Sequence, residues 1–397
     1  MRVVFNALAS YRQRTGVGSY IANLLAELPG LAGSDEIAAF PSGWMAQVAT
    51  VAGGLLKRRQ PHHVQPKSVP LEDKTRFRWR GFLKQFGKGL CKHGFQLTCS
   101  RSEFDLYHEP NFIPWPSELP VVLTVHDLSV LLHPEWHPLD RVKQHENNFP
   151  RSLRESRHII TVSETVRQET IRHFGIAPDR ITAVHNGVRS DMEPLPEAQV
   201  HEVLRRRGLP TKFVLYVGAV EPRKNLLTVM RAYCGLPSDV RSEYPLVLAG
   251  PWGWNYQKER AYYESVGRGR GILHLGYVAD DELPALYNAA RVLVYPSHYE
   301  GFGLPPVEML ACGGAVIAST AAALREVLGN RAEFVEPLDE AGWRLSLLRV
   351  LSDDEYRKRL SEGGSEYARR FSWRRSAEKT WHVYRQCIAV PRRRIAA

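Results

Sequence analysis

The sequence lacks an apolar segment long enough to cross a membrane, and its first residues do not have the pattern of a signal peptide. None of its apolar runs approaches the roughly 18 residues that cross a bilayer. The first apolar segment, residues 3–9, is soon followed by Tyr11-Arg12-Gln13-Arg14. It is therefore too short to be the apolar region of a signal peptide. The segment instead predicts a buried strand followed by a loop, and we expect a cytoplasmic protein.

Metal- and disulfide-forming patterns are also missing. The five cysteines are scattered without a C-x-x-C spacing, which argues against a disulfide framework and a structural zinc site. There is no Asp-x-Asp pair to hold a metal-bound diphosphate. His133 and His137 are four residues apart, but Pro134 and Pro138 break a helical presentation, so we interpret both as loop histidines. We therefore expect no metal and no bound cofactor.

A complete dinucleotide-binding fingerprint is absent. Gly16 and Gly18 have the spacing of its first two glycines, but Ile21 stands at the third position. This weakens a dehydrogenase interpretation. The turn keeps the ability to cradle phosphates through its backbone N–H groups.

Acidic residues are scarce in one window. Residues 57–101 hold 12 Lys and Arg against two acids, which accounts for nearly all of the net charge of +11. Such a patch indicates an anionic partner, either a membrane surface, a nucleic acid or an acidic substrate. A solvated or packed helix face is the alternative.

Two series of alternating strands and helices are present. The length of 397 residues suggests two domains. Short apolar runs and helical patterns alternate up to residue 190 and again from residue 212, which predicts two doubly wound parallel α/β domains facing each other. Ser163 is predicted to cap a helix that runs through Phe174. The predicted strands are residues 3–8, 104–108, 121–125, 180–185, 213–217, 246–249, 272–275, 292–295 and 315–318. The proline-containing segment 191–211 is predicted as the linker between them, and residues 373–397 as a C-terminal helix and tail.

The strongest chemical signal is EGFGLPPVE at residues 300–308. It follows a buried strand, so its glycines are predicted at the carboxyl edge of a parallel sheet, where open α/β folds bind ligands. Pro305 and Pro306 favour a helix start, which would put Glu308 in the first helical turn. Glu300 and Glu308 can then accept hydrogen bonds from opposite ends of a hydroxyl-rich ligand.

Two further motifs support this site. GAVEPRKN at residues 218–225 follows a strand and opens a helix, so Arg223 and Lys224 predict an anion site suited to a pyrophosphate. His126 ends a buried strand in the first half of the chain. It either contacts a sugar hydroxyl or is a core histidine paired with Asp127.

Taken together, these motifs resemble the retaining glycosyltransferases of family GT4, which have the GT-B fold. The resemblance runs nearly end to end. EGFGLPPVE matches the E-x7-E segment of that family, and it is accompanied by HDL at 126–128, TVSE at 161–164, NGV at 186–188 and EPRKN at 221–225. HDL combined with EPRKN is similar to the mannosyl- and rhamnosyltransferases of bacterial O-antigen, capsule and exopolysaccharide assembly. Ala315 and Arg325 depart from the family pattern, which often has proline at both positions.

The resemblance implies two Rossmann-like domains facing across a cleft, with an acceptor-binding domain at 1–190 and a donor-binding domain at 212–372. The tail at 373–397 would pack back on the first domain. It also implies metal-independent transfer of a hexose, with mannose from GDP-mannose as our expectation, to a lipid-linked saccharide. UDP-glucose, dTDP-rhamnose and GDP-rhamnose stay open as donors. The implied catalytic and donor-binding residues are Gly18, His126, Arg223, Lys224, Glu300, Gly301, Phe302, Gly303, Leu304 and Glu308.

The basic window fits a lipid-linked acceptor. Its cations recur every four residues beside an aromatic face, as in interfacial membrane helices. We expect contact with an anionic membrane surface at the inner face of the cytoplasmic membrane. The predicted contact residues are Arg76, Arg80, Phe82, Lys84, Phe86 and Lys88.

Two other functions stay open. Another GT-B enzyme, such as a glycoside phosphorylase or a sugar-nucleotide epimerase, would share much of the pattern, although we find no lysine site of the pyridoxal type. A nucleic-acid-binding protein built on the basic window is the second. The window carries no recognisable nucleic-acid-binding motif, so we expect no nucleic-acid partner.

Overall fold

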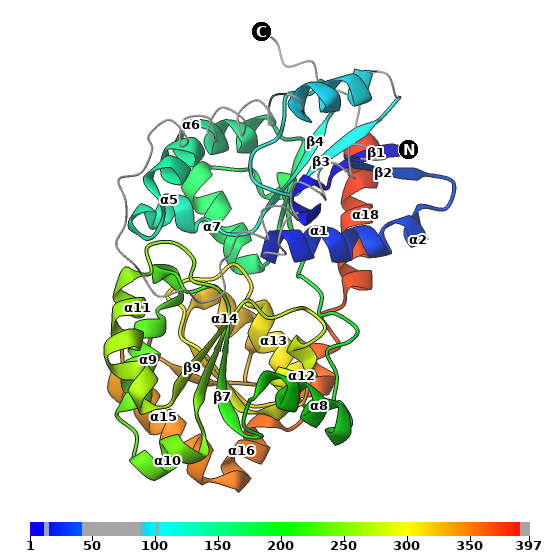
Figure 1. Cartoon of the computed structure of the whole chain (residues 1–397). Helices are drawn as coiled ribbons and strands as arrows, with labels where there is room; N and C mark the ends of the chain where they lie inside the picture. Colours follow the sequence, from blue (N-terminus) through cyan, green and yellow to red (C-terminus); the bar gives the residue numbers. More distant parts are fainter. Residues whose placement is uncertain (12–15, 42–88, 90, 101–102, 390–397) are drawn as a thin grey trace, which may run out of the picture.

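A computed structural model describes residues 1–11, 16–41, 89, 91–100 and 103–389 (Figure 1). The six predicted membrane-contact residues, 76 to 88, lie outside the described residues. No helix in the described part of the chain is long and apolar enough to cross a membrane.

The first sheet contains six parallel strands in the order β2-β1-β3-β4-β5-β6. Its strands are rich in Val, Ile and Leu because both faces of the sheet are covered. They are β1 (Arg2–Asn6), β2 (Glu36–Phe40), β3 (Leu106–Glu109), β4 (Val121–Val125), β5 (His158–Thr161) and β6 (Ile181–Ala183).

Successive residues of these strands point to opposite faces of the sheet. Val3 and Phe5 pack with helices α1 and α18 (Trp373–Ala389) on one face, whereas Val4 packs with Phe95 on the other. Helices α6 and α7 cover the β4–β6 side of that second face. The helical elements are η1 (Leu8–Tyr11), α1 (Gly16–Glu27), α2 (Pro29–Ala32), α5 (Ser129–Leu132), η2 (Pro134–Trp136), α6 (Leu139–Glu155), α7 (Glu164–Phe174) and η3 (Pro178–Arg180), with residues 91–100 also helical.

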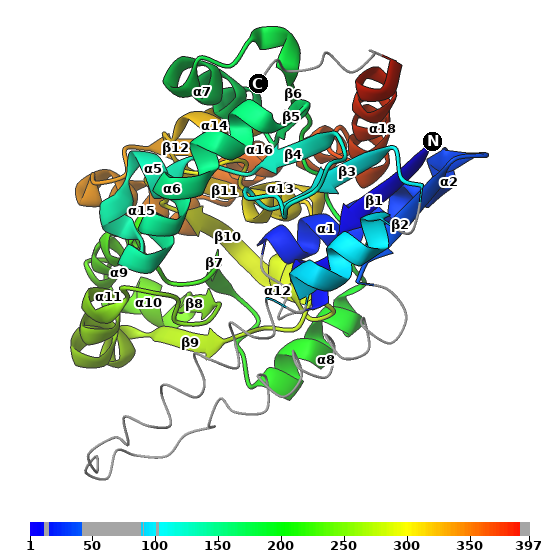
Figure 2. The same cartoon turned by 90° about the horizontal axis from the view of Figure 1, so that it is seen from above.

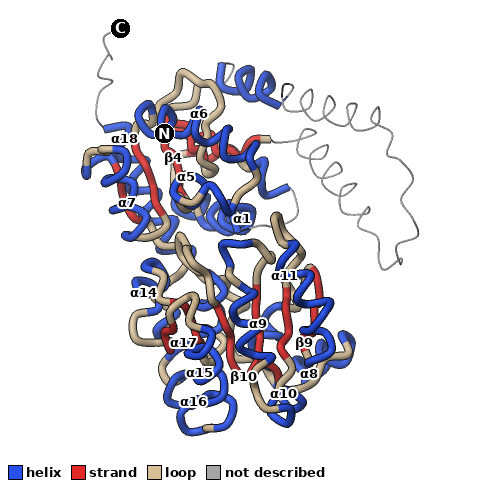
Figure 3. Tube along the Cα trace, turned by 90° about the vertical axis from the view of Figure 1, so that its left-hand side faces the viewer, coloured by secondary structure: helices blue, strands red, loops and turns tan. Residues whose placement is uncertain are grey.

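The second sheet is also parallel and six-stranded, in the order β12-β11-β10-β7-β8-β9. Its strands are β7 (Phe213–Val217), β8 (Leu246–Ala249), β9 (Ile272–Gly276), β10 (Ala290–Tyr295), β11 (Val316–Ser319) and β12 (Glu333–Val335). Two apolar clusters pack on its two faces. Figures 1 and 3 show helices against this sheet.

The helices of this half lie on both sides of the second sheet. α8, in the segment predicted as a linker, packs on α12, and its Val200 and Leu204 join the core of the second sheet. The elements are α8 (Glu197–Arg207), η4 (Pro222–Lys224), α9 (Leu226–Cys234), α10 (Ser238–Glu243), α11 (Gln257–Tyr262), α12 (Leu283–Ala289), α13 (Leu304–Ala311), α14 (Ala322–Leu328), α15 (Glu340–Ser352), α16 (Asp354–Ser361) and α17 (Gly364–Ala368).

After α17 the chain returns to the first sheet as α18 (Trp373–Ala389), which lies against α1 (Figures 1 and 2). Trp373, Trp381 and Tyr384 are buried in the same cluster as Val3 and Phe5. The two segments that join the halves run side by side, with a parallel bridge between Val188 and Ser372.

The predicted fold class is confirmed, since two doubly wound parallel sheets are present. The prediction missed β2, β5 and β12, which are short or begin with a polar residue. The exact domain boundaries stay predictions. In each sheet the strand order reverses at one place, between β1 and β3 and between β7 and β10, and these reversals are where doubly wound folds bind ligands.

Candidate functional site

The loop from β10 to α13 lies at the carboxyl end of the second sheet, at its strand-order reversal. Glu300 is 7% exposed, and Gly303 adopts a φ of +91°, a left-handed conformation that favours glycine. α13 begins at Leu304 with proline in its first positions, as predicted. Glu308 is the fifth residue of α13, so its predicted place in the first turn was wrong because the helix begins before the two prolines.

Four charged side chains alternate in sign beside this loop. The Arg223 guanidinium lies 2.9 Å from Glu221 and 2.9 Å from Glu300. The Lys224 ammonium lies 2.6 Å from the other Glu300 oxygen and donates to the Tyr295 hydroxyl at 2.8 Å. All four side chains are largely buried. The cluster therefore holds two cations in fixed positions, and the carboxylates of Glu221 and Glu300 compensate their charge.

Burial and the neighbouring charges shift the pKa values of the residues in this cluster. Burial alone would raise the pKa of Glu300, but the positive charges of Arg223 and Lys224 outweigh it and lower that pKa to about 2. Burial lowers the pKa of Lys224, and the Glu300 charge opposes this. We take the 2.6 Å contact as an ionised pair, since the carboxylate is fully ionised near neutral pH.

Arg223 and Lys224 lie on the short 3-10 turn η4, one residue before α9. The sequence predicted that the pair opens the helix itself. Asn225 prevents this, because it adopts a left-handed φ of +52°. Its side-chain amide donates to the carbonyls of Pro296 and Pro337 at 3.0 and 2.6 Å, which ties η4 to the loop after β10.

Glu308 lies apart from this charge cluster. Its carboxylate accepts a hydrogen bond from the Tyr287 hydroxyl at 2.7 Å. Burial raises its pKa, and the nearby Arg189 charge opposes the rise. The two glutamates of the motif therefore have different surroundings, one between cations and one beside a phenol.

His126 follows β4 of the first sheet and faces the second. Its Nε2 lies 2.8 Å from the Pro110 carbonyl oxygen, so Nε2 carries the proton, and burial lowers the pKa of the ring. Its own carbonyl oxygen would lie 1.8 Å from a Cβ at Gly301. The carboxyl ends of both sheets therefore meet here, with His126 opposite the 300–304 loop.

Further contacts join the two halves around this point. The Tyr299 hydroxyl accepts from the Leu128 amide at 3.2 Å and donates to Glu169 at 2.5 Å. Trp254 donates to the Trp136 carbonyl at 2.9 Å. The halves are thus in direct contact through both backbone and side chains.

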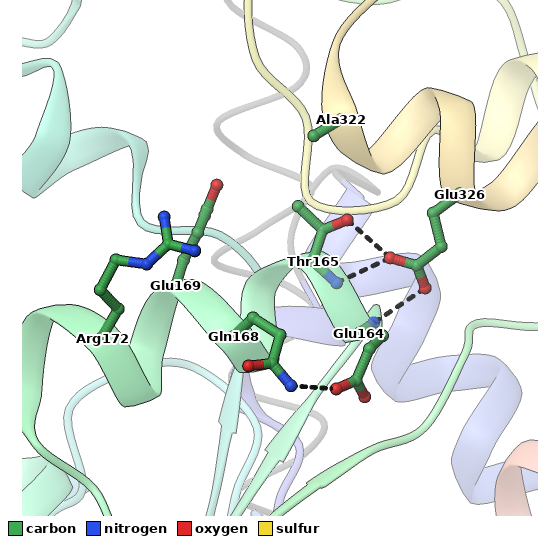
Figure 4. Close-up of a pocket in the computed structure, with 7 residues that line it drawn as sticks. All are labelled: Glu164, Thr165, Gln168, Glu169, Arg172, Ala322 and Glu326. Atoms are coloured by element: carbon green, nitrogen blue, oxygen red, sulfur yellow. Dashed lines mark hydrogen bonds between the residues drawn. The ribbon is translucent and has the colours of Figure 1, made fainter.

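Glu326 of α14 makes the most extensive of these contacts (Figure 4). Its carboxylate accepts from the backbone amides of Glu164 and Thr165 at 2.8 and 2.7 Å and from the Thr165 hydroxyl at 2.7 Å. It also contacts the His185 Nε2 at 2.8 Å. A side chain of one half therefore caps the first turn of α7 in the other half.

Two of the predicted site residues, Phe302 and Gly18, are buried away from the charge cluster. The Phe302 side chain is buried against Phe371 and His185, with ring centroids 5.5 and 5.9 Å away, so its backbone is the part that can meet a ligand. Gly18 is buried as the third residue of α1, and residues 12–15 before that helix lie outside the described residues. Glu326 and Tyr299 were not predicted, although TVSE marks the helix end that Glu326 caps.

Comparisons with known proteins agree with this geometry. Residues 14–191 match the description "Glycosyltransferase Family 4", and residues 205–367 match "Glycosyl transferases group 1". The chain is 39% identical over 285 residues to the O-antigen chain mannosyltransferase B of Escherichia coli, covering 70% of this chain and 74% of that protein. The chain belongs to the family 4 glycosyltransferases. This family 4 enzyme is therefore a glycosyltransferase, as predicted.

A second relative and a solved structure extend the comparison. The serotype-specific mannosyltransferase WbdA of Escherichia coli is 30% identical over 274 residues, which are 67% of this chain and 33% of WbdA, so the enzyme spans about a third of that relative. The structure of Anabaena HepE in complex with UDP-glucose superposes with a TM-score of 0.70 at 17% identity, covering 97% of this chain and 100% of HepE. That similarity shows the shared GT-B fold.

Proposed function

We propose that the enzyme transfers mannose from GDP-mannose to a lipid-linked saccharide, with retention of anomeric configuration and without a metal. The observation that carries the proposal is the pair of buried cations, Arg223 and Lys224, held opposite His126 at the reversal of the second sheet. The choice of mannose draws on the name of the O-antigen mannosyltransferase that is 39% identical. The choice of a nucleotide sugar draws on the shared fold of the UDP-glucose complex of HepE.

Each residue of the site has a role in this proposal. Arg223 and Lys224 neutralise the donor diphosphate as it departs, which is electrostatic stabilisation by groups that need no reorganisation. Glu300 and the backbone of Gly301 and Gly303 hold the hexose hydroxyls. We further assign the ribose hydroxyls to Glu308, the transferred sugar to His126, and the phosphates or acceptor to Gly18.

The reaction balances without a protein nucleophile. The bond between the sugar C1 and the diphosphate oxygen breaks, and the acceptor hydroxyl oxygen bonds to C1 from the same face. The hydroxyl proton passes to the departing diphosphate. Since the diphosphate leaves with both electrons, the two cations lower the barrier by stabilising the charge that develops on it.

Lys224→Ala and Glu300→Ala test the site. We expect each to reduce transfer by about 10³-fold, the size of effect for lost transition-state charge stabilisation. Glu300→Gln keeps the side-chain volume and guards against loss of folding from unpaired buried cations. Lys212→Ala is the matched control, because Lys212 is exposed and contacts Glu243. Near wild-type turnover in either site variant, with folding verified by circular dichroism, contradicts the assignment.

Product analysis with labelled GDP-mannose separates this function from its rivals. With acceptor and EDTA present, we expect a mannosylated product whose anomeric configuration, read by NMR, matches the donor. An epimerised nucleotide sugar formed without acceptor indicates an epimerase. Phosphate-dependent breakdown of a glycoside indicates a phosphorylase.

Contact with an anionic membrane surface, and hence a peripheral place at the inner face of the cytoplasmic membrane, is proposed from the sequence alone. The charge of residues 57–101 supports it. We expect sedimentation with anionic vesicles to decrease in Phe82→Ser/Phe86→Ser. Unchanged sedimentation contradicts the proposal.

A further inference from the structure

Tyr299 connects the two halves of the molecule through both its backbone and its side chain. It directly precedes Glu300 in the loop after β10, and its carbonyl oxygen accepts a hydrogen bond from Nη1 of Arg223 at 2.8 Å. The same guanidinium nitrogen lies 2.9 Å from the Glu300 carboxylate. The backbone of Tyr299 is therefore part of the charge cluster, while its hydroxyl oxygen lies 3.2 Å from the Leu128 amide nitrogen of the first half.

The Leu128 amide belongs to the short segment that carries His126. This segment is anchored within its own half, because the Leu128 side chain is buried in the core. Asp127 also accepts hydrogen bonds from the Ser129 amide and hydroxyl at 2.8 and 2.6 Å. The Leu128 N–H instead donates to Tyr299 in the other half. The bond from Tyr299 therefore acts on the backbone two residues after His126, with no flexible side chain between them.

Glu169 fixes the direction of the Tyr299 hydroxyl. It lies on α7, one turn after Thr165 (Figure 4), and its Oε2 accepts the hydroxyl proton at 2.5 Å. A phenol has one proton, so a hydroxyl that donates to Glu169 presents its lone pairs to the Leu128 amide. Burial raises the pKa of Tyr299 well above its usual value, so the phenol keeps this proton at neutral pH.

The loop that carries Tyr299 contacts the first half at a neighbouring point as well. The ring of His298 stacks on Trp136, with ring centroids 5.5 Å apart and an interplanar angle of 17°. The His298 amide also donates to the Arg223 carbonyl at 2.9 Å. Residues 298 and 299 thus join η4, which carries Arg223, to the first half of the chain.

A steric limit and a hydrogen bond act together at this junction. The close approach of Gly301 to the His126 carbonyl limits how near the two halves can come. The bond between Tyr299 and Leu128 opposes their separation. The distance between His126 and the Arg223 guanidinium is therefore limited in both directions. A displacement of reacting groups by about 1 Å lowers a rate by about 10²-fold, so this distance matters for turnover.

We propose that Tyr299 and Glu169 are positioning residues for glycosyl transfer, which hold His126 at the distance from Arg223 that the reaction needs. They act through the Leu128 amide and the Arg223 guanidinium rather than on the reacting atoms. The inference rests on the proposed function, since that function gives His126 and Arg223 their roles.

Initial rates of the full-length enzyme with labelled GDP-mannose and α-mannobiose test the proposal. We expect Tyr299→Phe to lower kcat and kcat/KM together by about tenfold or more, because the two halves no longer hold the reacting groups in place. The Kd for GDP-mannose should stay within about twofold of wild type, since the variant keeps every charged side chain of the cluster. Tyr356→Phe is the matched control, because Tyr356 donates to Glu333 at 2.9 Å within the second half, and its kcat should equal that of wild type.

Variants of Glu169 separate positioning from packing. Glu169→Gln keeps an oxygen that accepts the hydroxyl proton, so its kcat should stay within about threefold of wild type. Glu169→Ala should be as slow as Tyr299→Phe, and Tyr299→Phe/Glu169→Ala should be no slower than either, because all three lose the same oriented hydrogen bond. A wild-type kcat in Tyr299→Phe, or losses that multiply in the double variant, overturns the proposal.

Hydrogen exchange gives a readout that does not depend on the donor. Exchange at the Leu128 amide should accelerate by about tenfold or more in Tyr299→Phe, which lacks its acceptor, and stay unchanged in Tyr356→Phe. Unchanged exchange in Tyr299→Phe also overturns the positioning role. A wild-type enzyme that neither binds nor turns over GDP-mannose contradicts the proposed donor instead, and the exchange rates then still decide whether Tyr299 holds the segment of His126.

Discussion

Gly301 occupies a position that no other residue can take without moving one half of the molecule. A Cβ there would lie 1.8 Å from the His126 carbonyl oxygen, far inside contact distance, and that oxygen belongs to the backbone of the other half. Backbone cannot rotate away as a side chain can. The glycine therefore serves the approach of the two sheets as well as any approach to a ligand.

Gly301→Ala should consequently lower kcat/KM by about 10²-fold, the effect of displacing reacting groups by about 1 Å. The melting temperature should change little, because each sheet keeps its own core. Gly269→Ala is the control, since nothing lies within 4 Å of its added Cβ. Equal kcat/KM values for the two variants would show that the contact does not matter for turnover.

The sequence predicted much of the arrangement of the charge cluster at this scale. Glu300, Arg223 and Lys224 each follow a Val-rich strand, and parallel strands bring their carboxyl ends to one edge. The contact between Gly301 and His126 could not be predicted, because it depends on how two separately folded surfaces meet.

At the scale of elements, α7 is capped from two sources. Its own N-cap Ser163 accepts from the Val166 amide at 3.2 Å, as the sequence predicted. The amides of Glu164 and Thr165 instead donate to Glu326 on α14. Since these first-turn amides have no partner within the helix, the stability of α7 depends on contact between the two halves.

Glu326→Ala should therefore uncap α7 and loosen the junction. Two amides lose their acceptor, at a cost of about 1–3 kcal/mol. We expect hydrogen exchange at the Glu164 and Thr165 amides to accelerate by about tenfold or more. Glu362→Ala is the control, because Glu362 is an exposed glutamate that directly follows α16. Unchanged exchange at both amides would contradict the role assigned to Glu326.

The strands that the sequence failed to predict are those with weak local signals. β12 has three residues, β5 begins with His158, and β2 has the sequence EIAAF with few β-branched residues. Each is held by pairing with a neighbouring strand rather than by its own propensity. By contrast VVLTV and FVLYV, which became β4 and β7, were predicted to the residue.

For the whole molecule, buried histidines predict a loss of stability in acid. Burial lowers the pKa of His108 to about 3 and of both His137 and His158 to about 4. The unfolded chain binds these protons more readily than the folded chain. The neutral, buried histidines therefore stabilise the folded state above pH 6.5, and this stabilisation is lost as the pH falls toward 4. As the pH falls from 7 to 5, each of these histidines lowers the free energy of unfolding by about 2 kcal/mol.

Protonation of Glu109 changes the stability of the folded state in the opposite direction. Burial raises its pKa to about 7, so it favours the folded state increasingly as the pH falls from 7 toward 4.5, and it offsets about one of the histidines. We expect the free energy of unfolding, measured with urea, to be several kcal/mol lower at pH 5 than at pH 7. His158→Gln should reduce this difference. Equal stability at both values would contradict the neutral, buried state of the histidines.

The return of α18 to the first sheet has a consequence for synthesis. Trp373, Trp381 and Tyr384 complete the cluster that covers Val3 and Phe5, and the Tyr384 hydroxyl pairs with His108 at 2.5 Å. A ribosome adding about 5–20 residues per second needs roughly 20–75 s between the first strand and this helix. During that interval the opening half of the chain carries an uncovered apolar face, while the strands of the second sheet can already assemble. The half that is made first is thus the last to become native, and it is the one that nascent-chain chaperones would meet.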